Sequence, residues 1–114
     1  MSDRELLELA AKAAGIEGEW SAVYDCLLLT GIQTHEGCDT WDPLNDDGDA
    51  LRLAAGLSLC VFVNGMFVRA DCKHCSGGDI GYFEENTARN DGCIFKSTRR
   101  AIVRAAAAIG ESLS

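Results

Sequence analysis

The chain has 114 residues and a mass of 12.2 kDa, which is the size of one domain and argues against a two-domain enzyme with an interdomain cleft. Its 47% hydrophobic and 25% charged residues are typical of a globular protein. The net charge of −8 argues against a general nucleic-acid binder, because such a protein needs a surface that neutralises phosphates. We therefore predict a single folded domain over residues 1–114.

The charge is distributed unevenly along the chain. Residues 1–50 carry twelve acidic and two basic residues, a net charge of −10, whereas residues 51–114 carry six acidic and eight basic residues, a net charge of +2. The first half is expected to form an acidic face that attracts a protein partner with a basic surface. The alternative is a solvated face that only keeps the protein soluble.

The sequence contains no signal for membranes or export. No apolar run approaches the roughly 18 to 20 residues that cross a bilayer. The chain begins with the acidic segment MSDRELLE, where a signal peptide is basic. We expect a cytoplasmic protein without membrane contact.

A helix is predicted first in the chain, because Ser2 and Glu5 form a capping-box pair before a run of leucines and alanines at helical spacing. Gly15 is expected to end it. The aromatic and aliphatic residues of 19–30 favour a strand, and a second strand is expected around 32–34.

The acidic segment 41–49 contains the only proline and predicts a loop that leads into a helix over residues 50–57. Asp46, followed three residues later by Asp49, is the expected cap of that helix.

The clearest local pattern is a β-hairpin formed by residues 59–63 and 66–70. Asn64 and Gly65 join the two β-prone runs, and both residue types tolerate positive φ. We therefore predict a type I′ turn at this position.

A third strand of this group is predicted at residues 79–84, followed by a surface loop over 85–92. Ser97 or Thr98 is the expected cap of the last helix. That helix carries a stripe of small and aliphatic side chains suited to close packing on a sheet: Ala101, Ile102, Ala105, Ala108 and Ile109. The fold class is α+β, an antiparallel sheet with helices packed on it in the order α-β-β-α-β-β-β-α.

Three segments resemble a group of small phage and prophage proteins of proteobacteria whose layout is similar to the phage ABA sandwich domain. These segments are WDPLNDDGDALRLA (41–54), TRRAIVRAA (98–106) and DRELLELAAKAAGI (3–16). They lie at the two ends and in the middle of the chain and leave out the cysteine-bearing segments 26–38 and 72–93. The resemblance implies a small sheet covered by helices and a phage or prophage origin, and it carries over no catalytic residues.

The chain has six cysteines, namely Cys26, Cys38, Cys60, Cys72, Cys75 and Cys93. In a reducing cytosol the alternatives to disulfides are metal ligands and buried free thiols. Cys72 and Cys75 form a C-x2-C pair, and His35 and Cys38 form a matching H-x2-C pair. Together these four residues predict a Cys3His site for Zn²⁺, the one cofactor that the sequence suggests.

Other interpretations of the cysteines remain open. Cys93 or His74 could replace one of the four ligands, and Cys26 and Cys60 could be small hydrophobic residues in strands. A redox dithiol is less consistent with the sequence, because Ser76-Gly77-Gly78 after Cys75 does not begin a convincing helix.

The acidic segment also predicts a partner-binding loop, in which charged and apolar groups alternate. Its candidate contact residues are Trp41, Asp42, Leu44, Asp46 and Asp47. The alternatives are helix capping in a solvated loop, with Trp41 packed in the core. A calcium loop is excluded, because aligning Gly48 with its invariant glycine places Pro43 and Ala54 at ligand positions.

The arginines Arg99, Arg100 and Arg104 lie on the last helix, with Lys96 near its start. They could bind phosphate at the helix N-terminus. The alternative is that they pair with the abundant acidic residues.

Three hypotheses of function follow. The first, drawn from the resemblance and the acidity, is a phage or prophage accessory protein that binds a host or phage macromolecule and inhibits a host defence system such as CRISPR-Cas. The alternative is a small zinc-stabilised structural or interaction module. An enzyme is third, because the sequence contains no complete catalytic constellation.

Overall fold

The computed structural model describes residues 2–29, 40–72 and 81–113. Within these residues, three α-helices and two three-stranded antiparallel sheets confirm the predicted α+β class. The elements are α1 (Asp3–Ala14), β1 (Gly18–Ser21), β2 (Cys26–Leu29), β3 (Thr40–Trp41), α2 (Asp47–Gly56), β4 (Cys60–Val63), β5 (Phe67–Cys72), β6 (Gly81–Asn86), a 3-10 helix η2 (Thr87–Asn90) and α3 (Ile94–Ser112).

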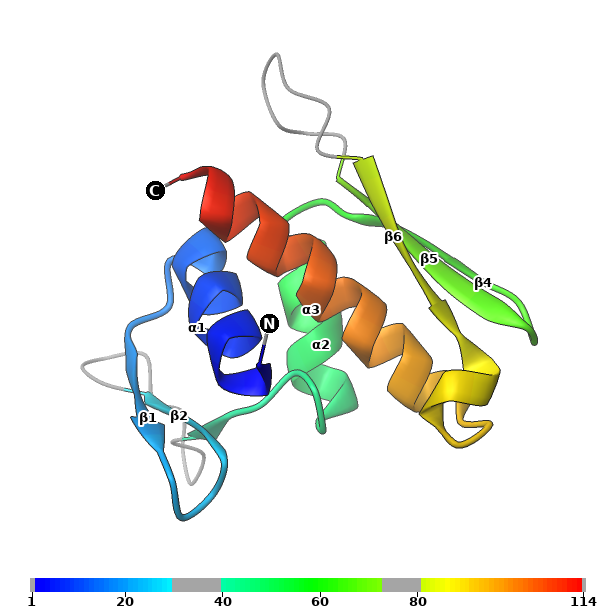
Figure 1. Cartoon of the computed structure of the whole chain (residues 1–114). Coiled ribbons are helices and arrows are strands. Elements are labelled where there is room, and N and C mark those ends of the chain that lie inside the picture. The colour runs from blue at the N-terminus through cyan, green and yellow to red at the C-terminus, as the bar shows by residue number, and fades with distance from the viewer. Residues whose placement is uncertain (1, 30–39, 73–80, 114) are drawn as a thin grey trace.

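The strands form two separate sheets, one on each side of the helices (Figure 1). The orders are β1-β2-β3 and β4-β5-β6, and every neighbouring pair is antiparallel. The prediction of one sheet is therefore corrected to two. None of the described helices has the length and apolar character that crossing a bilayer requires.

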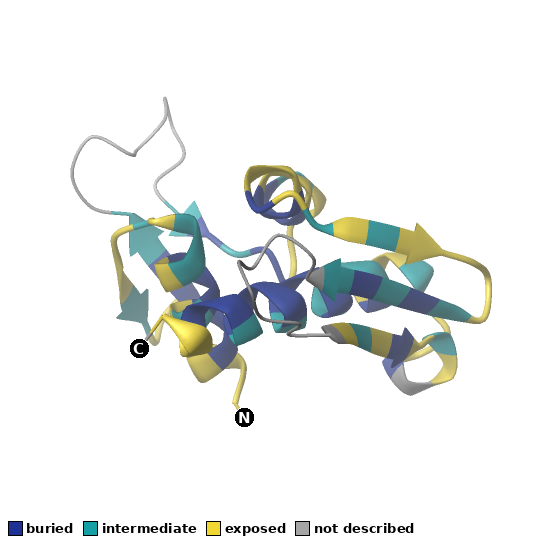
Figure 2. Ribbon diagram, turned by 90° about the horizontal axis from the view of Figure 1, so that it is seen from above, coloured by how far each residue is buried: buried dark blue, intermediate teal, exposed yellow. Residues whose placement is uncertain are grey.

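Helix α3 is the centre of the core, and it packs on α1, on α2 and on the β5–β6 side of the second sheet. Figure 2 shows that the buried residues gather on the inward sides of the helices and in β5. Four of the five predicted stripe residues of α3 are buried, and Ala108 is half-buried. A Cβ atom at Gly110 would lie 1.9 Å from the Leu9 carbonyl oxygen, so α1 and α3 approach closely there.

The predicted start and end of α1 are confirmed. The Ser2 hydroxyl accepts a hydrogen bond from the Glu5 N–H at 3.2 Å, and the Glu5 carboxylate reaches back to the Ser2 N–H. Gly15 follows the helix with φ of 71°, the left-handed conformation that glycine adopts without strain.

The predicted cap of α3 is wrong by about one turn. Cys93 is the N-cap, and its sulfur accepts a hydrogen bond from the Lys96 N–H at 3.4 Å. The hydroxyls of Ser97 and Thr98 donate instead to carbonyls four residues earlier, at 3.1 and 2.7 Å. Both hydroxyls are therefore hydrogen-bonded within the helix and do not cap it.

The long strand predicted over 19–30 is in fact a hairpin. Residues 22–25 form a turn between β1 and β2, and Asp25 takes a positive φ of 52°. Aspartate tolerates this conformation better than most residues, which explains a turn that lacks glycine and proline. The strand predicted around 32–34 lies outside the described residues.

The hairpin of β4 and β5 is confirmed, but its predicted turn is not. Neither Asn64 nor Gly65 has a positive φ, so the turn is not type I′. The Asn64 side-chain oxygen instead accepts from the Met66 and Phe67 N–H groups, at 2.8 and 3.2 Å. Asparagine thus shapes this turn through its amide rather than through its backbone.

The strand predicted at 79–84 corresponds to β6, and the predicted loop over 85–92 contains η2. Glu85 and Asn90 are buried there, although the sequence suggested a surface loop. The Asn90 amide donates to Glu85 Oε1 at 3.2 Å and to Ser97 Oγ at 3.1 Å, which compensates for the burial.

Candidate functional site

The acidic segment before α2 stabilises the start of that helix. Asp46 caps the helix, its Oδ2 accepting from the Asp49 N–H at 2.7 Å. Asp49 is itself buried, and its carboxylate accepts from the Asp42 N–H at 2.9 Å and from the Arg52 guanidinium at 2.7 Å. These bonds account for the capping interpretation of the cluster.

Arg99 of α3 fastens the same segment to the core. Its Nε donates to the Leu44 carbonyl oxygen at 2.8 Å, and its Nη1 lies 2.6 Å from Asp47 Oδ1. The other arginines of α3 also pair with acidic residues, Arg100 with Asp3 at 3.2 Å and Arg104 with Glu85. All three arginines that were candidates for phosphate binding therefore form ion pairs with acidic residues.

The two apolar residues proposed as partner contacts are in the core. Trp41 is 5% exposed and Leu44 is 8% exposed, so neither side chain offers an anchor on the surface. Their burial follows from the fold, because β3 pairs with β2 and Arg99 holds the loop down. Asp46 and Asp47 remain exposed, whereas Asp42 is half-buried.

Asp42 is a half-buried carboxylate near Cys26. Its Oδ1 atom is buried and has no hydrogen-bond partner among the described residues. Burial raises the pKa of the Cys26 thiol, and the charge of Asp42 raises it further. A thiol held in its protonated form is a poor nucleophile, so Cys26 is a packing residue.

Exposed apolar side chains instead gather between α2, β4 and the first turns of α3. Leu51 is 68% exposed, Val63 is 51% exposed and Phe95 is 63% exposed. They border a hollow of about 410 Å³ whose floor includes Ala50 and Ile102, and we call it the apolar groove. Asp47 lines one end of the groove.

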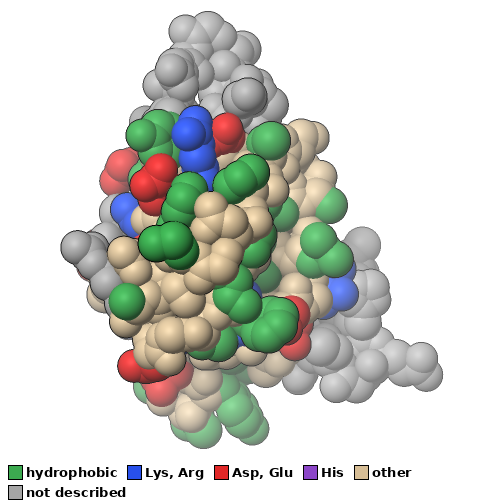
Figure 3. Space-filling view, turned by 90° about the vertical axis from the view of Figure 1, so that its right-hand side faces the viewer, with side chains coloured by type: hydrophobic (Ala, Val, Ile, Leu, Met, Phe, Trp, Pro, Cys, Tyr) green, Lys and Arg blue, Asp and Glu red, His purple; other side chains and the backbone are tan. Residues whose placement is uncertain are grey.

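Figure 3 shows the side of the molecule that carries the β4–β5 hairpin. Hydrophobic side chains are spread over the middle of this face, and charged side chains lie mostly toward its margins. Phe62 of β4 and Met66 of the hairpin turn are 56% and 78% exposed. Phe62 is next to Val63 in β4, so its side chain points to the side of the sheet opposite the groove that Val63 lines.

The sequence-based predictions did not include these residues, although the sequence shows them off the buried faces of their helices. The buried residues of α2 include Ala50, Leu53 and Ala54 at helical spacing, and Leu51 falls outside that stripe. Phe95 falls outside the buried stripe of α3 in the same way. One such residue is ordinary on a protein surface, whereas several that gather around one hollow indicate a contact surface.

The predicted zinc site lies mostly outside the described residues. His35, Cys38 and Cys75 belong to segments that the structure does not describe, and Cys72 is the last residue of β5, without a described side chain. Within residues 2–29, 40–72 and 81–113, no three His, Cys, Asp or Glu side chains are grouped as metal ligands. The zinc site stays a prediction, which the zinc content of protein purified without chelator would check.

No protein-family model, curated protein or solved structure matches this chain.

Proposed function

We propose that this chain is a non-catalytic binding protein that docks on a protein partner through the apolar groove. The observation that carries the proposal is the exposure of Leu51, Val63 and Phe95 around one hollow. Exposed apolar groups that surround a pocket are typical of protein–protein interfaces, where a few buried anchors supply most of the affinity.

The charge next to the groove favours a partner with basic groups at its rim. Asp46 and Asp47 expose 59% and 70% of their side chains at the start of α2, and Asp47 lines the groove together with its ion-pair partner Arg99. The net charge of −8 extends this attraction over a longer range. The apolar groove thus provides affinity, and the acidic residues provide orientation and speed of association.

The resemblance to phage and prophage proteins supports a biological use for such docking. An acidic protein that covers a basic surface is suited to blocking an effector that handles nucleic acid. We therefore propose inhibition of a bacterial defence system, such as CRISPR-Cas, in the cytoplasm of the host cell. This assignment rests on analogy and on charge.

Site-specific photocrosslinking tests the docking surface. A benzophenone amino acid at Leu51 or at Phe95 is expected to crosslink one and the same protein from a bacterial lysate. The matched control is Val23, which is 84% exposed in the β1–β2 turn and far from the groove in sequence. Equal crosslinking from Val23 would contradict the proposal.

The partner identified in this way then allows a kinetic test. Raising the salt concentration from about 50 to 500 mM should slow the association rate, because it screens the attraction between the acidic face and a basic partner. A melting curve at both salt concentrations checks that the fold persists. An association rate that does not change with salt would remove the role of the acidic residues.

A further inference from the structure

Strand β4 is an edge of the second sheet, because it pairs with β5 on one side and with no described strand on the other. The Asn64 N–H donates to the Phe67 carbonyl oxygen at 3.1 Å, which makes these two residues a hydrogen-bonded pair. Such pairs alternate along an antiparallel ladder, so the backbone groups of Phe62 face β5 and those of Val61 and Val63 face away from it. Among the described residues, no group bonds the outward N–H or carbonyl oxygen of Val61 or Val63.

The other edge of the same sheet is occupied in part by α3. Arg104 of that helix donates from Nη1 to the Glu84 carbonyl oxygen of β6 at 2.9 Å. β4 also lacks the charges and prolines that often protect an edge strand, because residues 53–68 contain neither. An edge of this kind selects an extended segment, since a strand offers a row of matching N–H and carbonyl groups.

The apolar groove lies along this free edge. Its lining comes from α2, from α3 and from Val63 of β4, and from none of the described residues of β5 or β6. The groove is therefore on the side of β4 away from β5, with α2 opposite. A strand added to β4 would lie about 4.8 Å from it, over the hollow of about 410 Å³. Its alternate side chains, about 7 Å apart, would point into that hollow.

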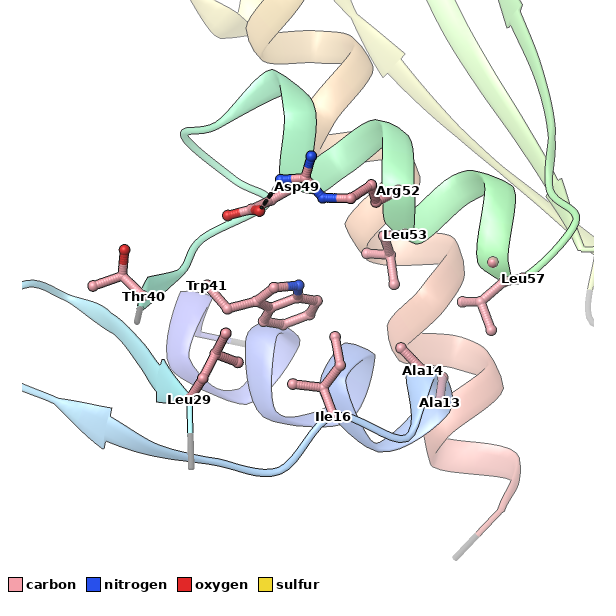
Figure 4. A pocket seen from close by; sticks show the side chains of 11 residues that line it. Ala13, Ala14, Ile16, Leu29, Thr40, Trp41, Asp49, Arg52, Leu53 and Leu57 are labelled. Carbon is pink, nitrogen blue, oxygen red and sulfur yellow. Dashed lines mark hydrogen bonds and ion pairs between the residues drawn. The ribbon is translucent and has the colours of Figure 1, made fainter. Parts of the chain in front are cut away.

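Helix α2 forms the opposite wall of the groove and is anchored on its other side. Figure 4 shows Leu53 and Leu57 pointing into a separate hollow that Trp41 and Ile16 also line. Leu53 and Trp41 are buried, so this side holds α2 in the core. Leu51 lines the groove and is exposed, which leaves it available to a segment placed between α2 and β4.

We infer that the protein partner contributes an extended segment that pairs with the free edge of β4 as a fourth strand and places alternate apolar side chains in the apolar groove. The inference rests on the proposed function, because it names what the partner lays in that groove. Backbone hydrogen bonds to Val61 and Val63 supply affinity, and the groove selects the apolar side chains. Basic residues at the remaining positions of the segment suit the net charge of −8.

Amide hydrogen exchange followed by nuclear magnetic resonance tests the inference in the full chain. The probe is a capped heptapeptide of alternating leucine and lysine, and the control peptide has the same residues with the leucines grouped together. In the free protein, the Val61 and Val63 amides should exchange faster than the Phe62 amide, which faces β5. The alternating peptide should slow both valine amides at least about tenfold, and the grouped peptide should not.

Val63 offers a matched pair of variants, because its N–H points away from β5. Val63→Pro removes that N–H and Val63→Ala keeps it, while both lose the branched side chain. The alternating peptide should bind Val63→Pro at least about tenfold more weakly than Val63→Ala. Melting curves check that both variants fold, and where Val63→Pro does not, amide exchange in the unaltered protein decides the result.

Failure of strand pairing would appear in the same measurements. A peptide that does not bind, or that binds without slowing the two valine amides, would overturn the inference, as would equal binding by the two variants. Protection without peptide, in a protein that sediments as a dimer, would overturn it by assigning the edge to a second copy of this chain. Photocrosslinking from Leu51 and Phe95 tests the proposed function separately, so crosslinks without strand pairing would remove this inference alone.

Discussion

The acidic segment Trp41–Asp49 and the apolar groove lie beside the same helix, α2, and use their residues in opposite ways. The acidic segment is rich in charge, yet its carboxylates cap α2 and bind Arg52 and Arg99. The groove has few charged residues, and its large apolar side chains remain exposed to solvent. The comparison indicates that the exposed apolar groups of the groove are available to a partner, whereas the carboxylates of the acidic segment serve the fold and act on a partner only through their charge.

The largest expected effect comes from truncating Trp41, the core residue at the start of the acidic segment. Trp41→Ala should lower the free energy of unfolding by about 3 to 5 kcal/mol, because it removes a large core side chain. Chemical denaturation measures the change. A loss below about 1 kcal/mol would mean that Trp41 is not part of the core, and the contrast between the two regions would fail.

The groove should respond in binding rather than in stability. Phe95→Ser removes an exposed side chain, so the free energy of unfolding should change by no more than about 0.5 kcal/mol. Affinity for the crosslinked partner should fall by about 2 kcal/mol, roughly 30-fold, as expected for an interface anchor. Calorimetry of binding and a melting curve separate the two quantities. Val23→Ser is the exposed control, and an equal loss of affinity in it would place the interface elsewhere.

Asp46 allows capping and charge to be separated. Asp46→Ala removes the acceptor for the Asp49 N–H and should cost about 1 kcal/mol of stability. Asp46→Asn keeps an N-cap acceptor and removes the charge, so it should retain most of the stability and slow association with a basic partner. Denaturation midpoints and association rates of both variants provide the comparison. Equal stability in the two variants would mean that the cap contributes nothing.

The smallest expected effect is at the hairpin turn beside the groove. Gly65 has no positive φ and a Cβ there meets no atom within 4 Å, so Gly65→Ala should change stability by less than about 0.5 kcal/mol. Asn64→Ala removes the acceptor of two backbone N–H groups and should cost about 1 kcal/mol. Thermal melts of both variants test the turn. A larger cost at Gly65 than at Asn64 would restore the type I′ turn.

Sequence patterns predicted correctly the elements that depend on residues close together in the chain. The capping box of Ser2 and Glu5, the cap at Asp46 and the β4–β5 hairpin each depend on residues a few positions apart, and all three occur. The start of α3 was predicted too late, because Cys93 acts as a cap and cysteine is not among the usual capping residues.

The candidate site was less accessible from the sequence, because exposure depends on distant neighbours. Leu44 is covered because Arg99, 55 positions later, bonds its carbonyl oxygen. Leu51 and Phe95 come together only when α2 packs on α3. The acidity of the segment was visible in the sequence, but the ion pairs that occupy its carboxylates were not.

The tight contact between Leu9 and Gly110 has a consequence for how the chain folds. It joins residues about one hundred positions apart, and the Asp3–Arg100 ion pair spans a similar separation. The entropy of closing such a long loop must be overcome before α1 gains its main packing surface. Folding should therefore be slow for a domain of this size, and a nascent chain still lacking α3 would expose the apolar stripe of α1 to chaperones and proteases.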